Sequence, residues 1–84
     1  MSVQAGETQY CHPREAGARR YTEVEIGFPS ACEDLLLEFA EDSRQPTETI
    51  YPYVPASLVS LVIAKHGGMI EGELPPGIPI LRAD

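Results

Sequence analysis

The sequence has no tryptophan and only six other aromatic residues, four Tyr and two Phe, among its 84 residues. A ladder of aromatic platforms for stacking single-stranded bases is therefore not expected. Basic residues are also scarce, because six Lys and Arg stand against 13 Asp and Glu and give a net charge of −7. A net negative charge repels phosphate backbones and anionic lipid surfaces. We expect neither direct nucleic-acid binding nor membrane binding.

Cysteines and long apolar runs are equally scarce. Cys11 and Cys32 are too few for a disulfide framework and lack a Cys-x-x-Cys spacing, so both are expected to be free thiols. The first twenty residues contain no apolar run typical of a secretory signal. No segment approaches the roughly 20 apolar residues of a membrane span. We therefore expect a cytoplasmic protein.

A chain of 84 residues has room for one domain. Residues 1–20 carry three Arg and two Glu, a charge of +1, whereas residues 21–84 carry −8. Because the first segment is polar and has no strand or helix period, we predict that residues 1–19 form a flexible or partly ordered arm. The alternative for part of this segment is that Tyr10 and Cys11 pair onto a sheet edge. Residues 20–84 are predicted to form a single compact domain.

A strand is predicted over residues 21–28. Val24, Ile26 and Phe28 alternate with Glu23 and Glu25, which is the period of a half-buried strand. The apolar side chains are expected to face the core and the glutamates to face outward.

A first helix is predicted over residues 30–42. Ser30 and Glu33 have the spacing of a capping box. Apolar residues then recur at helical spacing, beginning with Cys32, and form a stripe that would face the core. The outward side of this helix is acidic, with Glu38, Glu41 and Asp42.

A second helix is predicted from Pro55, in its first turn, to His66. Its apolar residues surround nearly the whole circumference: Leu58, Val59, Leu61, Val62 and Ile63. Such a helix is normally buried on all sides, and a short chain has few elements to cover it. We predict that the face with Leu61 and Ile63 meets another polypeptide. The alternatives are cover by the arm or ordinary single exposure of these side chains.

The remaining segments predict short strands. Residues 49–51 are predicted to form a very short strand, which Pro52 and Pro55 limit to a sheet edge or to an extended segment. Two further strands, 69–74 and 78–81, are joined by a type II turn at Pro76 and Gly77. The expected order is β-α-(β)-α-β-β. The expected fold class is α+β, a small two-layer sandwich of two helices on a 3-4 stranded mixed or antiparallel sheet.

Acidic residues lie on the outer side of several predicted elements, and the sequence predicts that they form one negative surface: Glu23, Glu25, Glu38, Glu41, Asp42, Glu71 and Glu73. Such charges usually keep a small domain soluble. A sharper hypothesis is docking onto a basic protein, including imitation of nucleic-acid phosphate, because complementary fields accelerate and orient association.

Catalytic chemistry is not predicted. Cys11, His12, Cys32 and His66 are zinc-ligand types without zinc-site spacing. Exposed carboxylate pairs lack the burial that general acid–base work requires. We predict no catalytic, cofactor or metal site. The aromatic segment 51–55 is expected to seal the core edge, with a rigid recognition element as the alternative.

Residues 74–81, Leu-Pro-Pro-Gly-Ile-Pro-Ile-Leu, resemble a short proline-rich segment near the C-terminus of the bacterial ornithine/lysine/arginine decarboxylases. The resemblance spans eight residues, and the chain is too short for the pyridoxal-phosphate domain of that family. It implies no activity or site here.

These features favour a small, acidic, non-catalytic protein-binding module, such as an inhibitor, an antitoxin-like protein or an accessory subunit. The profile is similar to that of phage-encoded anti-defence inhibitors. The expected partner is another protein with a basic surface, or a second copy of the chain in a homodimer. The alternative is a homodimeric small enzyme or ligand-binding domain whose interface site is lined by His66 and the aromatics of 51–54.

Overall fold

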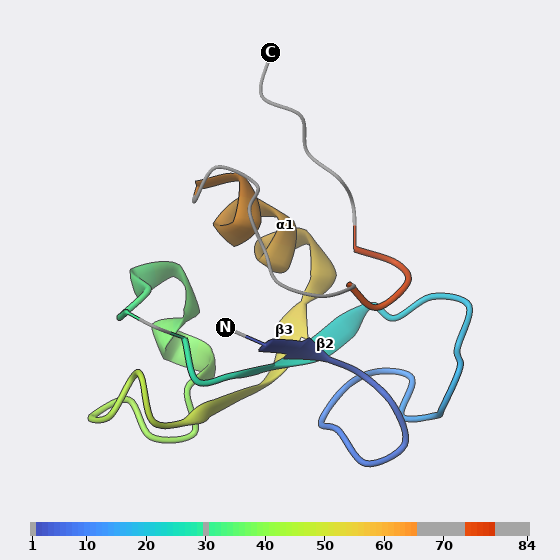
Figure 1. Ribbon diagram of the computed structural model, residues 1–84, viewed down its shortest axis with the longest axis horizontal. Coiled ribbons are helices and arrows are strands. Elements are labelled where there is room, and N and C mark those ends of the chain that lie inside the picture. The colour runs from blue at the N-terminus through green and yellow to red at the C-terminus, as the bar shows by residue number, and fades with distance from the viewer. Residues whose placement is uncertain (1, 30, 66–73, 79–84) are drawn as a thin grey trace.

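The computed structural model describes residues 2–29, 31–65 and 74–78 (Figure 1). Three strands form an antiparallel sheet in the order β1-β2-β3, with a bulge between β2 and β3. A 3₁₀ helix, η1, and an α-helix, α1, complete an α+β fold. The elements are β1 (Ser2–Gln4), β2 (Glu23–Gly27), η1 (Asp34–Phe39), β3 (Ile50–Pro55) and α1 (Ala56–Lys65).

Strand β2 confirms the alternation that the sequence predicts. Val24 and Ile26 are fully buried, whereas Glu23 and Glu25 are half-buried on the other face. The prediction for Phe28 is wrong, because this side chain is 61% exposed. Its φ of 45° takes the backbone into the left-handed region directly after β2, so the strand period ends before it reaches Phe28.

Strand β1 lies within the segment assigned to the arm. Val3 is paired with Ile26 of β2, so its side chain lies on the core face of the sheet. Further along this segment, Cys11 and Ala18 are buried in the core, and the backbone N–H of His12 donates to the Glu23 carbonyl at 3.1 Å. A three-residue strand is too short to show a period, and the sequence therefore gives no signal for it.

The first predicted helix is corrected in type and in length. In place of an α-helix over 30–42, the structure has the 3₁₀ helix η1, in which the N–H of Leu36 donates to the Glu33 carbonyl at 3.0 Å. Glu33 is the N-cap residue, and its side chain accepts from Leu35 N. Apolar residues spaced for the 3.6 residues per turn of an α-helix do not all fall on one face of a 3₁₀ helix, which has three residues per turn. Within η1, Leu36 is accordingly buried and Leu35 exposed; Cys32, which precedes the helix, is also exposed.

The second predicted helix is confirmed as α1, but Pro55, predicted for its first turn, is the last residue of β3, and α1 begins directly after it. It packs Val59 and Val62 into the core. Strand β3, which precedes it, is three residues longer than the predicted 49–51 but lies at the sheet edge, as its prolines indicate.

The last two predicted strands, 69–74 and 78–81, lie largely outside the described residues. The turn between them is present: Gly77 has φ 105°, the left-handed region that a type II turn requires at its third residue. The backbone N–H of Tyr21 donates to the Pro76 carbonyl at 2.8 Å. In the part of the chain that the structure describes, the element order is β-β-3₁₀-β-α, so the predicted order is not confirmed.

The core lies between the sheet and α1. Figure 1 shows α1 to one side of the strands and the N-terminal loop, 5–20, to the other. The largest fully buried side chains come from the sheet, both helices and this loop: Tyr51, Ile26, Leu36, Val24, Val54, Val59, Val62 and Cys11. Across the described ranges, no helix has both the length and the apolar character needed to cross a membrane.

Candidate functional site

One stripe of α1 remains at the surface, and it contains a single large apolar side chain. Leu61 is 53% exposed, between the exposed residues Ser57 and Ala64. Ile63 is half-buried and packs against the core. Of the two apolar residues predicted for an interface, Leu61 is therefore exposed enough to contact a partner, whereas Ile63 mainly packs against the core.

The last turn of α1 is tied to η1 by an ion pair. Lys65 Nζ lies 2.8 Å from Glu33 Oε1, and the carboxylate is almost fully buried while the lysine side chain is half exposed. The hydrogen bond to Glu33 raises the pKa of Lys65 above its ordinary value. Because the same carboxylate caps η1, this pair holds the two helices together and is structural.

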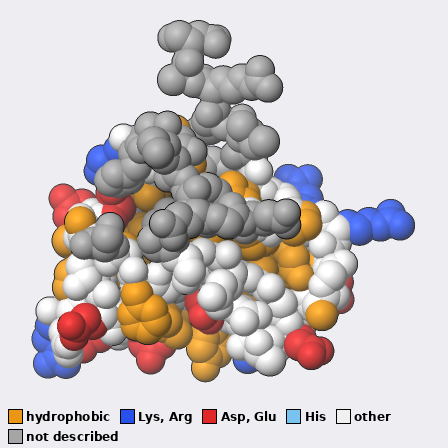
Figure 2. Space-filling view, in the orientation of Figure 1, with side chains coloured by type: hydrophobic (Ala, Val, Ile, Leu, Met, Phe, Trp, Pro, Cys, Tyr) orange, Lys and Arg blue, Asp and Glu red, His pale blue; other side chains and the backbone are white. Residues whose placement is uncertain are grey.

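The predicted acidic residues lie on different elements. Glu23 and Glu25 are half-buried on β2, and Glu38 and Glu41 are exposed at η1 and just after it. On the face in Figure 2, acidic side chains form separate patches among hydrophobic and uncharged surface. Asp42 pairs with Arg44 at 3.2 Å, which neutralises part of its charge. The remaining predicted acids, Glu71 and Glu73, lie outside the described residues.

A cluster that the sequence did not predict lies on the sheet face opposite the core. The Tyr10 backbone N–H donates to Glu25 Oε2 at 3.0 Å, and the Tyr10 carbonyl accepts from Tyr53 N at 3.0 Å. The two rings lie 6.0 Å apart between centroids and are tilted by 52°. The Arg14 guanidinium carbon lies 5.0 Å from the Tyr10 centroid. We call Tyr10, Arg14, Glu25 and Tyr53 the tyrosine surface.

A bulge in β3 places Tyr53 on this surface. Val24 pairs with Val54 but Ile26 pairs with Tyr51, so β3 has one extra residue between these positions. Tyr53 adopts φ 53°, which costs a non-glycine residue about 1–2 kcal/mol. Tyr51 is buried, as predicted for the aromatic segment, but Tyr53 is 43% exposed. The strand period places both tyrosines on one face, and Pro52 is the only signal of a bulge.

Phe28 and Leu35 are two further exposed apolar side chains, at 61% and 41%. Phe28, like Tyr53, combines an aromatic side chain with a left-handed backbone. Conformations of this kind persist only where the surrounding structure imposes them and are frequent at functional sites. In contrast to Tyr53, however, no ring contact holds Phe28 in the described structure.

The metal-ligand residue types do not converge in the described ranges, where no group of three His, Cys, Asp or Glu is placed to hold an ion. Cys11 is buried, and its thiol donates to the Gly6 carbonyl at 3.2 Å and accepts from Gly6 N at 3.3 Å. Cys32 is exposed. His12 is exposed, and His66 lies outside the described residues.

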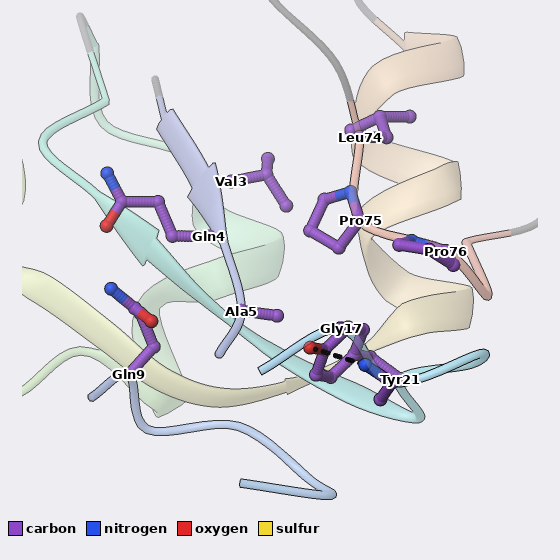
Figure 3. Close-up of a pocket in the computed structure, with 10 residues that line it drawn as sticks. Val3, Gln4, Ala5, Gln9, Gly17, Tyr21, Leu74, Pro75 and Pro76 are labelled. Atoms are coloured by element: carbon purple, nitrogen blue, oxygen red, sulfur yellow. Dashed lines mark hydrogen bonds between the residues drawn. The ribbon is translucent and has the colours of Figure 1, made fainter. Parts of the chain in front are cut away.

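An open cavity of about 470 Å³ lies between β1 and the segment 74–76. Figure 3 shows Val3, Gln4 and Ala5 opposite this segment. The only titratable side chain in the described lining is Tyr21. Its hydroxyl donates to the Glu15 carbonyl at 2.6 Å and accepts from Ala18 N. The described lining therefore presents amide and apolar groups without a nucleophile or general base.

Comparison of the chain with protein-family models, with curated proteins and with solved structures finds no match.

Proposed function

We propose that the protein is a small, non-catalytic protein-binding module of the inhibitor or accessory-subunit type. The observation that supports this proposal is the tyrosine surface, in which two tyrosines that are 40% and 43% exposed contact each other and have backbones held by hydrogen bonds. Tyr and Arg are enriched among the residues that dominate binding energy at protein interfaces. An aromatic anchor that is ordered before binding loses little conformational entropy on association.

The apolar helix and the acidic residues remain parts of the proposal. Leu61 supplies a second exposed apolar position, and Glu25 belongs to the tyrosine surface itself. A negative chain is attracted to a basic protein surface and repelled by a second copy of itself, which also carries −7. We therefore place a heterologous protein partner ahead of a homodimer.

Affinity capture with the full chain and two variants tests the proposal. We expect a specific partner to bind the wild type and Leu35→Asn, a matched change at another exposed apolar residue, but to be lost with Tyr53→Asn. Calorimetry with the purified partner should reproduce this order. Equal capture by all three proteins would contradict the proposal. A stable homodimer with an enclosed polar site and no partner would favour the enzyme or ligand-binding alternative.

We also propose a cytoplasmic location and a two-layer arrangement of the helices on the sheet. The location is supported by two unpaired thiols, Cys11 and Cys32, since an oxidising compartment favours disulfides. The two layers are supported by the burial of Val59 and Val62 of α1 in one cluster with Val24 and Ile26 of β2.

A further inference from the structure

We propose that the tyrosine surface binds an arginine side chain of a basic partner protein, and that Arg14 occupies this place in the free protein. The inference rests on the protein-binding function proposed above and names the chemistry of the partner. It makes Arg14 an internal competitor that the partner must displace.

Arg14 of the free protein lies over the Tyr10 ring. Its guanidinium carbon lies 5.0 Å from the centroid of the Tyr10 ring, which is within the range of a cation–π contact. The ring therefore already accepts the group that we assign to the partner. Arg14 is exposed and lies in the loop after β1, so its side chain can leave without disturbing the core.

The backbones of Tyr10 and Tyr53 are held by hydrogen bonds that do not involve Arg14. Tyr53 N donates to the Tyr10 carbonyl and Tyr10 N donates to the Glu25 carboxylate. The backbones that carry the two rings are thus held without Arg14, and the rings contact each other at 6.0 Å between centroids. When Arg14 moves away, the same aromatic surface remains for an incoming guanidinium.

The negative charge beside the tyrosine surface also favours a cation as its ligand. Glu25 and Glu23 lie on the same sheet face, and Glu25 contacts Tyr10 directly. A cation stacked on Tyr10 therefore lies beside carboxylate charge. Arginine is favoured over lysine because its planar guanidinium stacks on aromatic rings and is more weakly hydrated than an ammonium group. The net charge of −7 disfavours a second copy as the occupant.

Titration of the ¹⁵N-labelled full chain with two capped peptides, Gly-Arg-Arg-Gly and Gly-Lys-Lys-Gly, tests the proposal by NMR. We expect the arginine peptide to shift the amide signals of Tyr10, Glu25 and Tyr53, and the lysine peptide to bind more weakly. Tyr10→Leu should weaken binding of the arginine peptide by about two- to five-fold, the range of an exposed cation–π contact.

Two charge-matched variants test the role of Arg14. Arg14→Gln and Arg44→Gln remove the same charge, but Arg44 belongs to the pair with Asp42. We expect Arg14→Gln to tighten peptide binding by about two- to five-fold beyond Arg44→Gln, because the internal competitor is lost. The NMR spectra of the free variants verify that each is folded.

Three results would overturn the inference: equal binding of the two peptides, shifts that leave the tyrosine surface unaffected, or equal effects of the two arginine variants. If these occur while a protein partner still requires Tyr53, the protein-binding function stands and only the arginine assignment is wrong. If the full chain binds neither the arginine peptide nor a protein partner, both proposals are rejected.

Discussion

At the scale of single residues, two aromatic side chains are exposed by unusual backbone conformations. Phe28 and Tyr53 have φ values of 45° and 53°, in a region where Asn and Gly are the usual residues. The two differ in their surroundings, since Tyr53 contacts Tyr10 and Phe28 has the largest exposed fraction among the exposed large apolar residues.

Asparagine substitutions should separate backbone strain from packing. Phe28→Asn should raise the free energy of unfolding by about 0.5–1 kcal/mol, because Asn tolerates the left-handed region and little apolar contact is lost. Tyr53→Asn should change it by less than about 1 kcal/mol, because loss of the ring pair offsets the relief of strain. Urea unfolding measures both. Leu35→Asn, in a helix with ordinary backbone angles, is the control, and a clear loss of stability in Phe28→Asn would contradict this account.

At the scale of elements, α1 and β2 were predictable because each carries a regular period over enough residues. Val24 and Ile26 define the buried face of β2, and Val59 and Val62 define that of α1. The 3₁₀ helix η1 was not predictable from the sequence. Its N-cap residue, Glu33, is also paired with Lys65 of α1. That tertiary contact is invisible to a local pattern. The tyrosine surface was missed for a similar reason: it joins Tyr10 to Tyr53 through a bulge that no period reports.

Helix α1 offers a direct comparison of an exposed and a buried position one residue apart. Leu61→Lys should alter the free energy of unfolding by less than about 0.5 kcal/mol and leave the solution mass unchanged, because Leu61 is exposed. Val62→Ala should cost about 2 kcal/mol, because Val62 is 1% exposed and its loss leaves a cavity. Urea unfolding and light scattering measure these quantities. Large destabilisation by Leu61→Lys with unchanged mass would place Leu61 in the core.

At the scale of the whole molecule, two groups of the described residues, Lys65 and Tyr51, hold their protons more tightly in the folded state than in the unfolded chain. The hydrogen bond to Glu33 raises the pKa of Lys65. Burial, and secondarily the charge of nearby Cys32, raise the pKa of Tyr51. Both groups contribute their full stabilisation below their unfolded pKa values and lose it as pH rises through the folded values.

Stability should therefore fall as the pH rises above about 10, where the unfolded chain begins to release these protons. Urea unfolding across the alkaline range measures this decline, and the difference in tyrosinate absorbance between the wild type and Tyr51→Phe follows Tyr51 among the four tyrosines. Lys65→Met should be less stable than the wild type near neutral pH, because Glu33 loses this cation, and should show a shallower alkaline decline. An alkaline decline of the same slope in Lys65→Met and wild type would show that Lys65 does not contribute to it.

The extra residue in β3 lies between two buried pairs of the β2–β3 ladder, so the exposed face of the strand can change without its buried face. Deleting one residue at the bulge restores the regular ladder between β2 and β3 without altering Val24, Ile26, Tyr51 or Val54. Deleting Pro52 leaves Tyr53 alone between the buried Tyr51 and Val54, so it still faces outward, whereas deleting Tyr53 removes it from the surface. The exposed part of β3 can therefore lose one residue while the buried pairs on either side of it keep their partners.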